Sequence, residues 1–227
     1  MGWNHVQGSG AQASSGSSPT LTATFSGAVA AGDLIVVSGV WYAVVSGTPT
    51  MADNVNGANY TYKGPTVVSS TQNLGTWEYV TPKGALPGTF TITFTVPGTG
   101  NAYPAMAIDE FNYAVRATYA IDSSGTNTGA KATSMSLASA LTVSGIDLIY
   151  AAGLMAVPAT MSAGSGFTLA YNEPNLLAQA YGITSEYLFP ETSNINPSMS
   201  CSTAALTELN GIAFKAIAPY GAMLLPG

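Results

Sequence analysis

The regular alternation of apolar and polar residues in one short segment constrains the fold of this chain most strongly. The segment Thr89–Val96 reads Thr-Phe-Thr-Ile-Thr-Phe-Thr-Val and has a Pro-Gly pair on either side. Because successive side chains of a strand point to opposite faces, this period of two places every apolar side chain on one face. We therefore predict a half-buried β-strand here, bounded by turns.

Many other segments carry strand signals, and helical periodicity is nearly absent. Leu34–Tyr42 is rich in β-branched and aromatic residues, which is typical of a central strand covered on both faces. One or two helical turns are expected at most, at Ser136–Leu141 or Pro174–Gln179. The further predicted strands are 20–26, 60–62, 66–70, 77–81, 103–113, 117–121, 133–137, 146–156, 167–171, 178–188, 198–203 and 209–217. This pattern predicts an all-β fold, an antiparallel β-sandwich that is jelly-roll-like.

Three short motifs recur in the same order in the two halves of the chain. The pairs are Ala31–Val37 with Gly145–Ala151, Thr76–Tyr79 with Thr184–Tyr187, and Ala107–Phe111 with Gly211–Lys215. Two related strand sets would explain the recurrence, and so would chance similarity among strands of low complexity. Asp122–Lys131 is the one candidate linker, and it is not a clear Gly/Pro/Ser break, so we predict one domain.

The predicted β-sandwich domain spans residues 20–217, with a different kind of segment at each end. Residues 1–19 contain a run of small residues that buries little area, so they are predicted to be flexible. Residues 218–227 form an apolar tail, which we expect to dock on its own domain or on a neighbouring subunit. The candidate partner-binding residues in this tail are Tyr220, Met223, Leu224 and Leu225.

The chain carries few charges, with five Lys and Arg against eleven Asp and Glu and a formal charge of −6. A basic surface cannot form, so nucleic acid is not expected as a partner. The hydrophobic content of 47% argues against disorder. The longest apolar stretch, Leu148–Met161, is shorter than the ~20 residues that cross a bilayer, so no membrane partner is expected. One His and one Cys cannot build a zinc site or a disulfide scaffold, and we expect no cofactor.

Asp109 and Glu110 are the one adjacent carboxylate pair, and paired carboxylates can act as general acid and base. On a strand they would point to opposite faces, so an ion pair with the nearby Arg116 is the simpler interpretation. Glu78 and Glu186, on the repeated motifs, are the residues that could meet either carboxylate in the fold. We assign no catalytic residue from this pattern and expect no enzyme.

Two further candidates each have a simpler explanation. Asp53-Asn54-Val55-Asn56-Gly57 resembles the start of a calcium loop, but position 64 is Gly where an EF-hand needs Glu. An Asn/Gly hairpin, or a looser calcium site, would account for the same residues. Cys201 would need His5 as a partner to act as a nucleophile, and a buried strand thiol is the simpler expectation.

Aromatic side chains are the remaining binding candidates, because their faces can stack on sugar rings. The candidate platform consists of Trp3, Trp41 and Trp77 with Tyr42, Tyr60, Tyr62 and Tyr79. In strands such residues also serve as core or cross-strand pairs. A glycan is therefore kept as an alternative partner.

The order of several motifs resembles a β-sandwich module found in phage virion structural proteins and in bacterial extracellular proteins. The motifs are Phe25, Ala31–Val37 and Trp41, then Asp53, Gly57 and Asn59–Thr61, then Gly75–Trp77 and Tyr79, Pro104–Ile108 with Glu110-Phe111, and Ala213–Lys215. The resemblance spans most of the chain and implies a jelly-roll-like sandwich used for surface display or assembly. It carries over no catalytic residue.

Within that resemblance we expect a non-enzymatic virion structural protein. Residues 1–5 show neither the basic region nor the apolar core of a signal peptide, which favours a virion protein made in the host cytoplasm over an extracellular one. The specific expectation is a capsid decoration (cement) protein that forms a homo-oligomer, such as a trimer, and contacts the major capsid protein or other virion subunits. Fibre and tail-tube subunits are close to this expectation.

Two alternatives remain from the sequence. The first is a carbohydrate-binding or adhesive module, in which Trp and Tyr side chains stack on glycans. The second is a polysaccharide-cleaving jelly roll, which needs two carboxylates, or a Tyr with a basic partner, in one groove. Five basic residues make the latter groove difficult to build.

Overall fold

The computed structural model describes most of the chain as strands and short connections. The described residues are 2–13, 20–42, 48–67, 72–80, 88–97, 102–114, 117–173 and 182–217, with only the backbone for 42, 62–67 and 72–80. The predicted partner-binding residues of the tail, Arg116 and the predicted turn Pro174–Gln179 lie outside them. Among the described residues no helix is long and apolar enough to cross a membrane.

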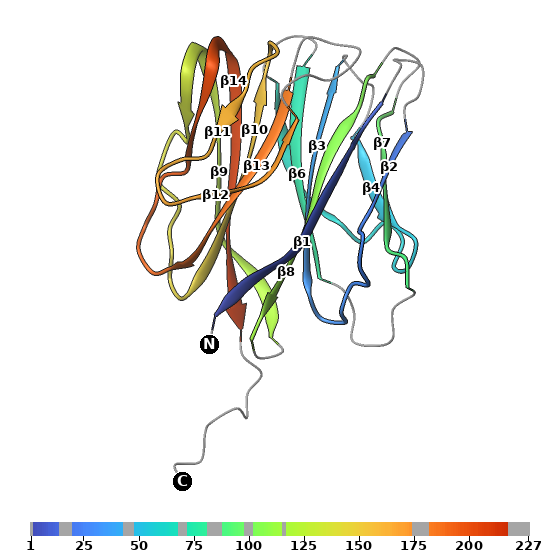
Figure 1. Ribbon diagram of the computed structural model, residues 1–227. Coiled ribbons are helices and arrows are strands. Elements are labelled where there is room, and N and C mark those ends of the chain that lie inside the picture. The colour runs from blue at the N-terminus through green and yellow to red at the C-terminus, as the bar shows by residue number, and fades with distance from the viewer. Residues whose placement is uncertain are drawn as a thin grey trace.

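Three antiparallel sheets pack in layers (Figure 1). The N-sheet has the order β1 (Trp3–Gln12), β8 (Ala105–Tyr113), β3 (Leu34–Tyr42), β6 (Gln72–Val80) and β5 (Thr61–Val67). The C-sheet has the order β11 (Met161–Ser162), β14 (Ser198–Ile217), β10 (Asp147–Met155), β13 (Gly182–Glu191) and β12 (Thr168–Glu173), and β9 (Thr118–Ser136) pairs with β14. The outer sheet has the order β2 (Thr20–Thr24), β7 (Thr91–Thr95) and β4 (Thr50–Asp53). The predicted all-β class with packed antiparallel sheets is confirmed.

The N-sheet and the C-sheet repeat one strand order. Reading β9-β14-β10-β13-β12 beside β1-β8-β3-β6-β5, each set places its last strand second and its second strand in the centre. The central strands β3 and β10 carry the first repeated motif, and each pairs a Leu with a Phe: Leu34 with Phe111, and Leu148 with Phe214. The shared strand order favours two related strand sets over chance similarity. The third motif is displaced by one residue in the register, because Phe214 and not Lys215 takes the place of Phe111.

The two sheets face each other with their strand orders reversed. The first strand in the order of the N-sheet, β1, contacts the last strand in the order of the C-sheet, β12, and β5 contacts β9. In the first half of the chain, β2 and β7 pair with each other outside the N-sheet. In the second half, the β-bridge between Leu141 and Ile195 joins the two segments at the equivalent positions, before β10 and before β14. In the first set the pairings β1 with β8, β2 with β7 and β3 with β6 are nested. However, β5 adjoins β6 and not β4, so the predicted jelly-roll connectivity is not established.

The apolar side chains form three layers of core. One lies between the N-sheet and the C-sheet, one between the N-sheet and the outer sheet, and one on the far side of the C-sheet. Along β3, Leu34 and Val36 enter the first layer and Ile35 and Val37 the second. The predicted central strand is therefore covered on both faces.

Three expectations about local structure are wrong. The segment predicted to be flexible contains β1, which pairs with β8 from Trp3 to Gln12. The candidate linker Asp122–Lys131 lies inside β9, which pairs with β14 along its length, although separate strands were expected at its two ends. Ser136–Leu141 is not helical. In the first two cases a neighbouring strand supplies backbone hydrogen bonds, so small and polar residues adopt strands without an apolar face of their own.

Candidate functional site

Two adjacent carboxylates on β8 are fully buried. Asp109 and Glu110 are both 0% exposed. Because they are neighbours on a strand, Asp109 points between the N-sheet and the C-sheet, and Glu110 points toward the loop after β2. The prediction that they face opposite sides is confirmed, and Asp109 pairs with His5.

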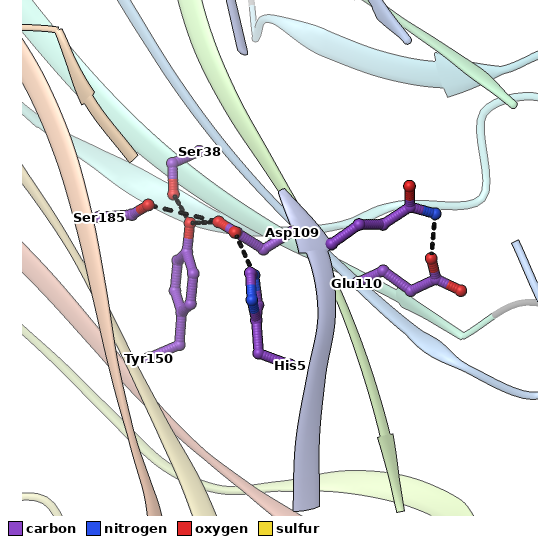
Figure 2. A network of polar contacts seen from close by, with 7 residues as sticks. His5, Ser38, Asp109, Glu110, Tyr150 and Ser185 are labelled. Atoms are coloured by element: carbon purple, nitrogen blue, oxygen red, sulfur yellow. Dashed lines mark hydrogen bonds and ion pairs between the residues drawn. The ribbon is translucent and has the colours of Figure 1, made fainter. Parts of the chain in front are cut away.

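Asp109 accepts three hydrogen bonds from side chains on three other strands (Figure 2). His5 Nε2 on β1 donates to Oδ1 at 3.0 Å, and Tyr150 Oη on β10 donates to Oδ2 at 3.0 Å. Ser185 Oγ on β13 also donates to Oδ2, at 3.3 Å. Ser38 Oγ on β3 donates to Tyr150 Oη at 3.3 Å. We call these five residues the Asp109 cluster, and it joins the N-sheet to the C-sheet.

A β-bulge in β1 brings His5 into this cluster. His5 pairs with Phe111 and Gln7 with Glu110, so Val6 is an additional residue in β1. Without the bulge, His5 and Gln7 would point to the same face; with it, they point to opposite faces. His5 therefore reaches Asp109, while Gln7 Nε2 donates to Glu110 Oε2 at 2.5 Å.

Gly8 provides the space in which the His5–Asp109 hydrogen bond forms. Gly8 lies opposite Asp109 in the sheet register. A Cβ atom at this position would lie 2.7 Å from Asp109 Oδ1 and 3.4 Å from His5 Nε2. A side chain here would displace the carboxylate, so the glycine is required by close approach.

Two tyrosines beside Asp109 have raised pKa values. Burial, followed by the charge of Asp109, raises the pKa of Tyr150 well above its usual value, so the phenol stays protonated and donates. Burial and then Asp109 also raise the pKa of Tyr187, whose ring stacks on His5 with 4.7 Å between centroids. The cluster thus satisfies a desolvated carboxylate, as a buried charge requires.

The described contacts do not assemble a nucleophile. Ser185 donates to Asp109 rather than to His5, and no hydrogen bond links His5 to a hydroxyl or thiol among the residues with described side chains. Cys201 Sγ donates to the carbonyl of Thr203 at 3.1 Å, and burial raises the pKa of its thiol. Cys201 is the expected buried strand thiol, and the His5–Cys201 pairing is wrong.

The other sequence candidates have separate structural roles. Glu186 does not meet Asp109 or Glu110: Gly164 N donates to its Oε2 at 2.7 Å, and burial raises its pKa to about 8. Asp53 accepts the N–H groups of Val55 and Asn56, which is hairpin geometry. Within the described part of the chain, no group of three or more His, Cys, Asp or Glu could hold a metal ion. The side chain of Glu78 lies outside the described residues.

The predicted aromatic platform is wrong for the residues that can be placed. Trp3 is 3% exposed and Trp41 is 1% exposed, and both belong to core layers. Tyr60 is half-buried and donates to Asp53 Oδ2 at 3.2 Å. The side chains of Trp77, Tyr42, Tyr62 and Tyr79 lie outside the described residues.

A pocket of about 330 Å³ lies on the second half of the molecule. Its lining is Ser123–Thr126 from β9 together with residues 138–142. None of these side chains is titratable. The pocket offers hydroxyl groups to a ligand but no acid or base.

Sequence reasoning missed four members of the Asp109 cluster, namely His5, Ser38, Tyr150 and Ser185. Ser185 belongs to a repeated motif, but the neighbouring Glu186 was selected because it carries a carboxylate. The sequence matches no protein-family model, and no curated protein or solved structure is significantly similar to it. The functional argument therefore depends on the geometry above.

Proposed function

We propose that this chain is a non-enzymatic structural protein of a phage virion, specifically a capsid decoration (cement) protein. The observation that supports this most is how few acidic side chains reach the surface. Seven of the eleven are buried, namely Asp33, Asp53, Asp109, Glu110, Asp147, Glu186 and Glu208. Charged residues are depleted at the cores of protein interfaces, so such a surface suits packing against other subunits.

The internal contacts support a structural role over catalysis. Asp109 and Glu110 hold strands and loops in place through donors that surround them. Their oxygens are used within the molecule, and both side chains have no exposed area. A catalytic carboxylate must instead reach its substrate.

The proposed partners are further copies of this chain, in a trimer, and the major capsid protein. The proposed contacts are the apolar tail residues Tyr220, Met223, Leu224 and Leu225. Their chemistry fits a buried contact, because a free tail of this composition would expose apolar area to water.

The first test measures assembly in solution and on particles. Light scattering after gel filtration should give a symmetric oligomer, and cryo-electron microscopy of native particles that contain the chain should show it as repeated density on the capsid. A monomer that is absent from the capsid lattice would contradict the proposal, as would turnover of a substrate.

The second test isolates the tail. Removal of residues 218–227 should abolish the oligomer while leaving the unfolding temperature nearly unchanged. Ile146→Ser is the matched control, because it removes an apolar side chain that is 43% exposed elsewhere on the surface. If the truncated chain keeps its oligomeric state, the tail is not the contact.

A carbohydrate-binding module is the second candidate. The observation that favours it is the hydroxyl-lined pocket on β9, since sugars bind through hydrogen bonds to such groups. Binding to neutral oligosaccharides on a glycan array, lost in a Thr126→Val variant and retained in a Thr22→Val variant on the outer sheet, would support this function. An array without a binder would exclude it.

A further inference from the structure

Lys215 on β14 lies beside a buried carboxyl group on the neighbouring strand. Asp147 on β10 is directly opposite Lys215 in the sheet register. On the other side of β14, the register of β9 shifts at Asp122, which is an additional residue between Ile121 and Ser123. Side chains that are directly opposite in an antiparallel pair point to the same face, with Cβ atoms about 5 Å apart. The lysine is therefore within reach of Asp147.

The carboxyl group of Asp147 has lost its water without gaining a donor. Asp147 is 0% exposed, and neither of its carboxyl oxygens has a hydrogen-bond partner in the described part of the chain. Glu191, its other cross-strand neighbour, accepts hydrogen bonds from the two residues that follow it. Burial, and then the neighbouring Asp122, raise the pKa of Asp147 to about 6, while Lys215 opposes the shift. A large share of these carboxyl groups is therefore protonated near pH 6.

Ser144 connects the amine of Lys215 to the second carboxylate. Lys215 Nζ donates to Ser144 Oγ at 2.9 Å, and Ser144 Oγ donates to Asp122 Oδ1 at 2.9 Å. The backbone N–H of Ser144 donates to Asp122 Oδ2 at 2.5 Å. The Ser144 hydroxyl and N–H lower the pKa of Asp122, so this carboxylate is ionised. A proton can thus pass from the lysine through the hydroxyl to Asp122.

Gly145 leaves a space that both side chains border. A Cβ atom on Gly145 would lie 3.4 Å from Asp147 Oδ1, 3.9 Å from Lys215 Cγ and 4.0 Å from Lys215 Cε. Among the described residues, Lys215 forms no ion pair with Asp147, because its amine is turned toward Ser144. The flexible four-carbon stem of lysine allows the amine to rotate toward Asp147 across this space.

We propose that Lys215 and Asp147 join in an intramolecular isopeptide bond. The ammonium group first gives one proton through Ser144 to Asp122, and the free amine attacks Cγ of the protonated Asp147. The Nζ–Cγ bond forms, and the hydroxyl of Asp147 takes a second proton from Nζ and leaves as water. Asp122, which is half-buried, returns its proton to the solvent. The products are one amide, one water and one proton, and no other reactant is needed.

The surroundings of Asp147 favour the amide over the separate groups. A buried ion without partners is costly, and the amide replaces the carboxyl group by a neutral one. The sheet register holds the amine and the carboxyl group together, which raises their effective concentration. Because Asp147 has no exposed area, water has little access to hydrolyse the product.

The equivalent place in the first set does not carry this nucleophile. Asn112, which follows Phe111 on β8, takes the place of Lys215, which follows Phe214 on β14. The amide nitrogen of asparagine is not a nucleophile, so the bond is specific to the C-sheet. There it fastens β14, the last strand before the tail, to β10. The bond forms once per chain and is independent of the structural role proposed above.

Mass spectrometry of the full chain, incubated near pH 6 and then denatured, tests the bond. The chain should be lighter than its sequence requires by the mass of one water molecule. Trypsin should fail to cleave after Lys215, because the acylated side chain is no longer a cation, and fragment spectra should join Lys215 to Asp147. A chain of full mass that trypsin cleaves at Lys215 would overturn the proposal, as would a loss of water that maps to other residues.

Variants separate the reacting groups from the relay. Lys215→Arg keeps the positive charge but is not a nucleophile, so this variant should have its full mass. Lys131→Arg, at an exposed position on β9, is the matched control and should still lose water. Asp122→Asn keeps an oxygen for Ser144 but accepts no proton, so the bond should form about a hundredfold more slowly after refolding. Loss of water from Lys215→Arg would overturn the bond, and an unchanged rate in Asp122→Asn would overturn the relay.

Discussion

The two related strand sets share one strand order, but their facing surfaces differ at a matched position. In the N-sheet Val36 pairs with Asp109; in the C-sheet Tyr150, which takes the place of Val36, pairs with Ile212. One set thus contributes a buried carboxylate and the other contributes the phenol that donates to it. The comparison teaches that a repeated scaffold can be joined by making the two copies unlike where they meet.

Removal of the Asp109 carboxylate should lower the stability of the protein most. Asp109→Ala leaves two buried hydroxyl donors and the half-buried His5 ring without their acceptor, so the free energy of unfolding should fall by about 3–5 kcal/mol in urea denaturation. Ile212→Val, at the matched position of the C-sheet, should cost about 1 kcal/mol. Equal losses for the two variants would show that the carboxylate does not join the sheets.

Removal of the facing phenol should have the next largest effect. Tyr150→Phe deletes one donor to a charged acceptor, which should cost about 1.5–3 kcal/mol. Ser38→Ala removes a donor to the phenol instead, so it should cost about 0.5–1.5 kcal/mol. The reverse order in chemical denaturation would mean that Ser38, not Tyr150, supports the cluster.

Glu186, one of the buried acids of the second set, should make the stability of the fold depend on pH. Glu186 accepts one backbone N–H, and burial raises its pKa to about 8, so it is neutral in the folded chain at pH 7. The unfolded chain holds fewer protons between pH 5 and 8, so stability falls as the pH rises, by ~1.4 kcal/mol per pH unit at most from this group. Glu186→Gln should flatten the slope between pH 7 and 8 in urea titrations. Stability that increases with pH in this window is incompatible with a neutral Glu186.

The smallest expected effect comes from filling the space beside the carboxylate. Gly8→Ala places a Cβ atom against Asp109 Oδ1 and should lower the free energy of unfolding by about 1 kcal/mol. Gly88→Ala is the control, because a Cβ there has no atom within 4 Å. A neutral Gly8→Ala variant would mean that the cluster adjusts without loss.

The sequence was sufficient to predict a strand where the strand carries its own apolar face. The alternation in Thr89–Val96 predicted β7, and the composition of Leu34–Tyr42 predicted a doubly covered strand, because both signals depend on local residues. The repeated motifs also identified the strands that occupy equivalent places in the two sets. The opposite directions of Asp109 and Glu110 followed from strand geometry alone.

The sequence was insufficient to predict a strand or a side-chain direction where pairing with a strand distant in the sequence determines it. The strands β1 and β9 contain many Gly, Ser and Thr residues and become strands through pairing with β8 and β14. The bulge at Val6, which directs His5 to Asp109, has no local signature. A register shift between Asp147 and Ile149 places Ser185, not Glu186, at the junction of the sheets, since a slip of one residue exchanges the two faces.

The burial of most acidic groups also determines how the folded chain responds to its medium. Dissolved salt screens charges that face water, but it reaches enclosed groups such as Asp109 far less. The ionic strength of the medium should therefore have little influence on the forces that hold the sheets together.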